Sequence, residues 1–153
     1  MITQRVLLAG HATLAIFVLG SCSINPNDPL NSHFALVERS ATDFPVTESL
    51  MLTDLYGSEW TKFSVICPYT PYAKIKHELN VDDPPVPEHG LSDSENDLFL
   101  RDAVGNEQWI RFSRGEIDLC SYTDGSAVKP TSRPVEFSLD QRGGVWILSG
   151  LHD

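Results

Sequence analysis

The N-terminal segment differs in composition from the rest of the chain, and this division constrains the fold more than any other feature. Residues 1–5 carry the free amine and Arg5, and residues 6–19 are fourteen consecutive residues without a charge. A membrane-spanning helix needs about 20 apolar residues, so the run has the length of a secretory signal rather than of a span. Removing residues 1–21 leaves 132 of the 153 residues, which suffices for one domain with one hydrophobic core.

The apolar run ends in a cleavage motif, Val18-Leu19-Gly20-Ser21-Cys22. A leucine three positions before a cysteine, followed by two small residues, resembles the lipobox of bacterial lipoproteins. The resemblance implies that the chain is exported, cut before Cys22 and attached to membrane lipid through acyl chains, such as palmitate, on that cysteine. Two alternatives remain open: an ordinary secretory signal, in which a small residue usually stands where Leu19 is, and an anchor that is never cut.

The same resemblance bears on location and on domain boundaries. Acylation places the mature chain in the cell envelope, where more than one acyl chain is needed for stable attachment. Ser23 rather than aspartate follows the cysteine, which in a diderm bacterium favours the outer membrane over the cell membrane. Residues 22–33 are rich in proline, asparagine and serine and predict a flexible tether, followed by a single domain over residues 34–153.

The chain is acidic, with 11 Lys and Arg against 21 Asp and Glu and a formal net charge of −10. The part after the signal segment carries −11, because the signal segment contains only one charged side chain, Arg5. This balance disfavours nucleic acid as a partner, since Lys and Arg supply most of the affinity for phosphates. It equally disfavours an electrostatic attachment to anionic lipid headgroups.

With Cys22 assigned to lipid, two of the three cysteines remain, Cys67 and Cys120. In an exported chain such a pair predicts a disulfide. The alternatives are two separate buried thiols or a metal pair, but neither cysteine has a C-x-x-C partner or a histidine beside it, as a zinc site would.

Helical signals concentrate in two segments. Residues 45–56 place apolar side chains at near-helical spacing, with Gly57 positioned to end the helix. Residues 71–79 predict a second, shorter helix that begins at a proline and ends at Asn80. Residues 34–37 are apolar and are compatible with either a strand or the start of a helix.

Strand signals occupy the rest of the chain. Apolar and polar side chains alternate in short runs at residues 60–67, 98–101, 108–113, 117–122, 135–139 and 145–149. Short strands separated by glycine-bearing turns predict an antiparallel meander. We therefore expect an α+β fold in which an N-terminal helix or two helices pack on a curved antiparallel β-meander of about four to six strands, with one disulfide. The helix over residues 45–56 is expected to cover one face of the sheet.

Catalytic motifs with a known geometry are missing from the sequence. There is no G-x-S-x-G elbow, Walker loop or G-x-G-x-x-G turn. His77-Glu78 begins like a zinc-protease motif, but Val81 stands where the second histidine must be. The sequence therefore favours a protein that is not an enzyme, and it implies no cofactor.

The acidic segment over residues 80–97 offers carboxylates to a metal. Asp93, Glu95 and Asp97 have the spacing of the first three ligands in a calcium loop, but the glycine and the final glutamate of such a loop are missing. Two histidines lie in or near this segment and are candidate transition-metal ligands, His77 and His89. The simpler interpretation is a solvated surface loop.

The aromatic residues suggest a contact surface. The three tryptophans fall in predicted strands, where in a small domain they serve the core more often than a ligand. If Ile110 and Phe112 face the core, Trp109 and Arg111 lie on the opposite face of their strand. An aromatic side chain beside an arginine is a composition found at interface hot spots, so this pair predicts contact with a partner.

These observations lead to one functional expectation. The chain is expected to be a membrane-anchored envelope lipoprotein that is not an enzyme and that binds a protein, peptide or glycan partner at the cell surface or in the periplasm. Two alternatives stay open: a secreted, inhibitor-like module, and a small metal-binding protein or enzyme that uses the acidic segment over residues 80–97.

Overall fold

The computed structural model describes residues 27–122, 125 and 127–151, so the expected signal peptide, Cys22 and the first residues of the expected tether lie outside the described part. The elements in chain order are α1 (Pro29–Ser40), β1 (Val46–Leu50), α2 (Leu52–Tyr56), β2 (Trp60–Ile66), α3 (Tyr72–Leu79), β3 (Glu95–Asp102), β4 (Glu107–Ser113), β5 (Ile117–Asp118), β6 (Lys129–Pro130), β7 (Val135–Leu139) and β8 (Trp146–Leu151).

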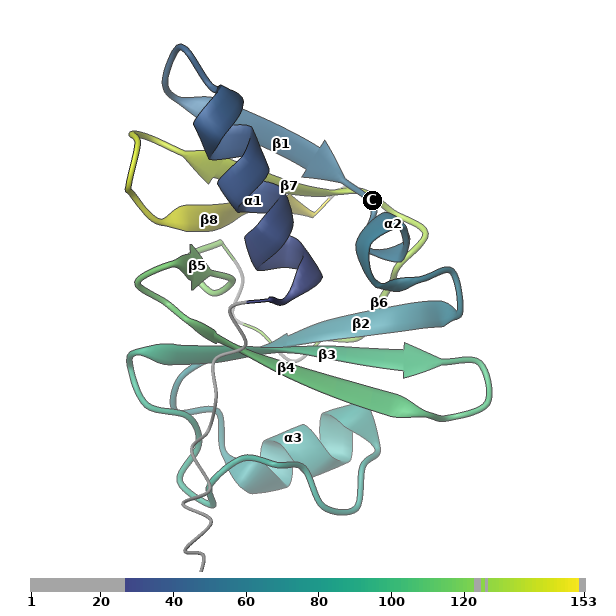
Figure 1. Ribbon diagram of the computed structural model, residues 1–153. Coiled ribbons are helices and arrows are strands. Elements are labelled where there is room, and N and C mark those ends of the chain that lie inside the picture. Colours follow the sequence, from purple (N-terminus) through teal and green to yellow (C-terminus); the bar gives the residue numbers. More distant parts are fainter. Residues whose placement is uncertain (1–26, 123–124, 126, 152–153) are drawn as a thin grey trace, which may run out of the picture.

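The strands form two four-stranded sheets (Figure 1), one in the order β1-β7-β8-β5 and the other in the order β4-β3-β2-β6. The strand pairs are antiparallel, apart from β5 and β8, which run parallel. The domain is α+β, as predicted, but the expected single meander is wrong. Strands β2 and β3 pair, as do β3 and β4, in one sheet, but in the other sheet β7 lies between β1 and β8.

Helix α1 occupies the second half of the expected tether. Asp28 caps it by accepting a hydrogen bond from the Leu30 amide at 2.9 Å, and Pro29 stands in the first turn, where its missing N–H is not needed. Leu30 and Phe34 are buried, and the Phe34 ring stacks on Trp146 with 4.2 Å between ring centroids. The tether prediction is therefore wrong from Pro29 onward, because residues that break a helix interior also mark a helix start.

The expected helix over residues 45–56 is a strand in its first half. Strand β1 pairs with β7 along its whole length, and α1 rather than this segment lies over the sheet of β1, β7 and β8 (Figure 1). Val46 and Leu50 share one face of either a helix or a strand, so their spacing did not separate the two structures. The second half is helical as predicted, and α2 ends at Gly57, whose φ of 110° suits glycine.

The sheet β4-β3-β2-β6 is buried on both faces. Leu98 and Leu100 of β3 face a large core shared with α1 and the other sheet, and Phe99 faces a smaller core on the side of α3. Figure 1 shows α3 on the outer face of this sheet, away from the sheet of β1, β7 and β8. The predicted helix over residues 71–79 is thus confirmed as α3, and Asn80 ends it in the left-handed conformation.

The predicted disulfide is confirmed. Cys67 follows β2 and Cys120 follows β5, so the bond joins the two sheets, with 5.6 Å between the two Cα atoms. A Cβ on Gly125 would lie 3.0 Å from the sulfur of Cys67, so Gly125 packs closely against the bond. The disulfide therefore fixes the junction of the two sheets.

Candidate functional site

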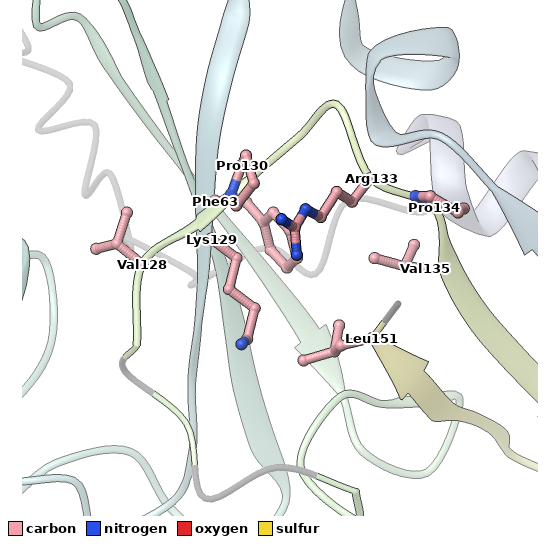
Figure 2. Close-up of a pocket in the computed structure, with 8 residues that line it drawn as sticks. All are labelled: Phe63, Val128, Lys129, Pro130, Arg133, Pro134, Val135 and Leu151. Carbon is pink, nitrogen blue, oxygen red and sulfur yellow. The ribbon is translucent and has the colours of Figure 1, made fainter. Parts of the chain in front are cut away.

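A cavity of about 190 Å³ lies where the two sheets meet beside β6, and we call it the seam pocket. Figure 2 shows Lys129 and Arg133 at the cavity, on β6 and on the segment between β6 and β7. Apolar side chains from three strands complete the lining: Phe63 of β2, Val135 of β7 and Leu151 of β8. Both sheets thus contribute to one small site.

The chain between β6 and β7 is held in place by backbone pairing and by one threonine. In β6, Lys129 pairs with Phe63 of β2, and Pro130 then ends the strand at the edge of the sheet. Thr131 is buried, and its hydroxyl donates a hydrogen bond to the Trp60 carbonyl at 2.5 Å. After Thr131 the chain continues through Arg133 into β7 of the other sheet. The seam pocket lies beside this connection between the two sheets.

The charge of the seam pocket is opposite to that of the protein. Among the described residues, Lys129 and Arg133 line it and no carboxylate does, although the whole chain carries −10. In the described part of the chain, Lys129 forms no ion pair, whereas most arginines on the sheet are matched. Arg133 already interacts with another group of the chain, so Lys129 beside the apolar floor is the charged side chain that the pocket offers to a ligand.

The predicted partner surface at Trp109 and Arg111 is occupied by internal contacts. Both residues lie on the strand face opposite Ile110 and Phe112, as expected, but this is the face of the smaller core beside α3. Trp109 packs on Phe99 with 4.7 Å between ring centroids, and the Arg111 guanidinium donates to the Asp97 carboxylate at 2.8 Å. The structure therefore gives these two half-buried side chains a role in packing, and their contact with a partner stays a prediction.

Two buried carboxylates are held by arginines within the fold. Burial raises the pKa of Asp97, and the hydrogen bonds and charge of Arg111 offset part of that rise. Burial alone would raise the pKa of Asp118 as well, but hydrogen bonds from Arg114, a backbone amide and Ser121 outweigh it and hold this pKa below its ordinary value. Both ion pairs connect neighbouring segments of the chain, so structure explains them without a catalytic role.

The predicted calcium ligands do not form a loop. Strand β3 begins at Glu95, so Glu95 and Asp97 belong to a strand and not to the acidic segment, and Asp97 is buried against Arg111. Asp93 precedes the strand and is exposed. His77 on α3 and His89 in the following loop are exposed, and no group of three or more His, Cys, Asp or Glu within the described residues is arranged to hold a metal ion.

A second, more open groove of about 380 Å³ lies between α1 and the turns that flank β5 and β8. Phe34 and Trp146 form its apolar part, and Glu38 and Glu116 supply carboxylates. Glu38 is already engaged, because one of its oxygens accepts the Gly143 amide at 2.5 Å. The indole N–H of Trp146 has no partner among the described residues, but it is buried and does not reach the groove surface. The groove therefore marks the line along which α1 packs against the rest of the domain.

Lys129 and Arg133 are the site residues that the sequence reasoning missed, since they lie outside the predicted helices and strands. A signal was present, because two cations four positions apart, each followed by proline, are unusual in so acidic a chain. The rest of the pocket comes from Phe63 and Leu151, which are distant in sequence.

No family model, curated protein or solved structure matches the chain. Within the described part of the structure, no helix has the length and apolar character needed to cross a membrane.

Proposed function

We propose that this chain is an exported lipoprotein of the cell envelope, anchored through acylated Cys22, whose domain is not an enzyme and binds a partner at the seam pocket. The disulfide between Cys67 and Cys120 is the observation that supports export, because such bonds persist in oxidising compartments outside the cytoplasm. The bond joins two sheets of one domain, so it belongs to the fold rather than to the surface. Export is also what the N-terminal motif implies.

The start of α1 limits how far from the membrane the proposed anchor can hold the domain. Asp28, which caps α1, stands six positions after Cys22. Six residues reach about 20 Å even when fully extended, so an acylated Cys22 holds the domain close to the membrane surface. The proposed partner is therefore a molecule present at or near the same membrane.

The seam pocket supports a binding function. Ligand sites are typically concave, mostly apolar and furnished with a few polar groups, and the seam pocket has an apolar floor of Phe63, Val135 and Leu151 beneath two cations. The charged side chains of this lining within the described residues, Lys129 and Arg133, are both positive. A protein or peptide partner, which can present a carboxylate beside an apolar side chain, fits this lining better than a neutral glycan.

The anchor is tested by membrane fractionation of the wild-type chain and Cys22→Ala in a bacterial host, with intact mass measured on each product. We expect the wild type to pellet with membranes and to carry acyl mass, and the variant to remain as the uncut precursor. Ser23→Ala is the matched control, because it changes the neighbouring residue but keeps the cysteine. If the wild type and Cys22→Ala are both cut and released in soluble form, the anchor is wrong and a secreted module replaces it.

A further inference from the structure

We propose that α1 lies on the surface of the membrane that holds Cys22, with Ser32, Leu36 and Arg39 turned toward the lipid headgroups. We call these three residues the outer row of α1. The inference rests on the proposed function, because it takes acylated Cys22 as the anchor and names the face of the domain that meets the bilayer. Three features support it: the composition of the outer row, the length of chain before α1 and the position of the acidic side chains.

The outer row is exposed on the side of α1 that faces away from the core. Ser32, Leu36 and Arg39 stand at positions i, i+4 and i+7, a spacing that places three side chains on one face of a helix. All three are exposed, and 61% of the Leu36 surface is accessible, whereas Leu30 and Phe34 on the other side are buried. An apolar side chain with a cation beside it suits a helix that lies in the interface of a bilayer.

The outer row carries no carboxylate, although the chain has 21 Asp and Glu. Residues 29–40 include one acidic side chain, Glu38, and it accepts a hydrogen bond from the Gly143 amide at 2.5 Å. Arg39 is exposed, and its Nε donates to the Ala35 carbonyl at 2.9 Å, one turn earlier in α1. The phosphates of anionic lipids attract a cation in this place, while its apolar stem lies against the edge of the hydrocarbon.

The chain between the anchor and α1 is short. Pro29 stands seven positions after Cys22, and seven residues reach about 24 Å when fully extended. Leu36 follows seven residues later, about 10 Å along the helix axis. A link of this length makes the contact of α1 with lipid intramolecular, at an effective concentration on the order of millimolar. One leucine and one arginine therefore suffice to orient a domain that the anchor already holds.

The acidic segment over residues 80–97 lies on the other side of the domain. Helix α1 packs into the large core on one face of β3, whereas Val86 and Leu91 of the acidic segment pack into the smaller core on the other face. Figure 1 shows α1 and α3 on opposite sides of the sheet that contains β2, β3 and β4. With α1 on the bilayer, the exposed carboxylates of the segment lie away from the lipid phosphates: Asp82, Asp83, Glu88 and Asp93. The reverse orientation would bring like charges together and is disfavoured.

The test uses the full mature chain, acylated at Cys22, in vesicles of phosphatidylethanolamine and phosphatidylglycerol. Leu36→Cys supplies a thiol for an environment-sensitive fluorescent label, because Cys22 carries lipid and Cys67 is bonded to Cys120. We expect the emission of the label at position 36 to shift to shorter wavelength on the vesicles. We also expect it to fall by at least half when the lipids carry bromine on their acyl chains. Absence of this quenching would overturn the inference.

Labels at two other positions test the assigned face. Val104→Cys is the matched control, because Val104 is an exposed apolar residue in the turn between β3 and β4. His89→Cys reports on the opposite side of the domain, since His89 is exposed within the acidic segment. We expect little quenching at either position. Quenching at position 104 or 89 equal to that at position 36 would contradict the assigned face.

A second substitution tests the role of the cation. Arg39→Gln, combined with the label at position 36, should reduce the quenching at least twofold. Lys62→Gln is its control, because Lys62 is an exposed cation on β2, outside α1, and it should leave the quenching unchanged. Equal losses with the two substitutions, in variants whose melting temperatures show that they are folded, would mean general attraction to anionic lipid and would overturn the inference.

The contact and the anchor fail separately. A chain with a histidine tag in place of residues 1–21 and with Cys22→Ser is held on nickel-chelating lipid without acylation, so it tests the contact alone. Quenching at position 36 in this chain, beside a wild type that is released without acyl mass, refutes only the anchor. A wild type that pellets with acyl mass, beside a label at position 36 that is not quenched, refutes only the contact.

Discussion

Removal of the disulfide between Cys67 and Cys120 should lower the stability of the domain by an amount that depends on the length of chain between the two cysteines. The two residues are separated by 53 positions. In the loop-entropy treatment a cross-link of this span restricts the unfolded chain by about 4 kcal/mol. A domain of this size is stable by roughly 5–15 kcal/mol in total, so the loss is a large fraction of the whole.

The measurement is urea denaturation of the wild type and of the variant Cys67→Ala/Cys120→Ala, each followed by tryptophan fluorescence. Alanine at both positions avoids a free thiol and keeps the nearly buried Cys67 site apolar. We expect a lower midpoint in the variant and a steeper dependence on urea, because the unfolded chain without the cross-link exposes more surface. Reduction of the wild type should have the same effect.

With every chain produced without residues 1–21, Cys22→Ala is the matched control for loss of a cysteine, and it should leave the free energy of unfolding unchanged. A difference below about 1 kcal/mol between the wild type and the double variant would refute the reasoning, since it falls far short of the entropy of the restricted loop. It would mean that packing between the sheets, rather than the covalent link, holds the junction together.

Two further predictions concern α1 and its connection to α2. Phe34→Ala removes a buried ring stacked on Trp146 and should lower the free energy of unfolding by about 3–5 kcal/mol in urea titrations. Leu36→Ala, on the exposed side of the same helix, should change the free energy of unfolding by less than about 0.5 kcal/mol. Equal effects of the two substitutions would mean that α1 does not pack as described. Burial raises the pKa of Tyr56 far above 10.0. The charge of the Asp28 carboxylate, which accepts a hydrogen bond from the Tyr56 hydroxyl at 2.7 Å, raises this pKa further. The Tyr56 hydroxyl therefore stays protonated to higher pH in the folded state than in the unfolded chain. Its contribution to stability is complete below pH 10 and falls above pH 10 by about 1.4 kcal/mol per pH unit. Urea titrations across pH 9–11 should show this dependence in the wild type and not in Tyr56→Phe.

Local signals predicted the parts of the fold that depend on neighbouring residues. The run of alternating residues at 108–113 correctly placed Ile110 and Phe112 on one face of β4 and Trp109 and Arg111 on the other. Turn and cap residues correctly ended α2 and α3. The surroundings of each face could not be predicted in this way, because α3 reaches the Trp109 face from another part of the chain.

The seam pocket shows the same limit at the level of the site. Its two cations are visible in the sequence, but their apolar partners come from β2 and β8, at Phe63 and Leu151, and only the folded chain brings them together. The side of a strand on which a residue points follows from alternation, whereas the cavity depends on how two sheets meet. No local sequence pattern encodes the distance between the two sheets.

The sequence by itself determined the acidic charge, the alternation of the strands and the expected disulfide between Cys67 and Cys120, and it predicts the export signal. Tertiary structure decided that residues 29–33 form a helix, that Val46–Leu50 is a strand, and that the strands divide into two sheets. The physical reason is burial at long range. An apolar residue lowers the free energy of the fold wherever it finds a partner, and the partners of α1 and β1 are β7 and β8, about a hundred residues further along the chain.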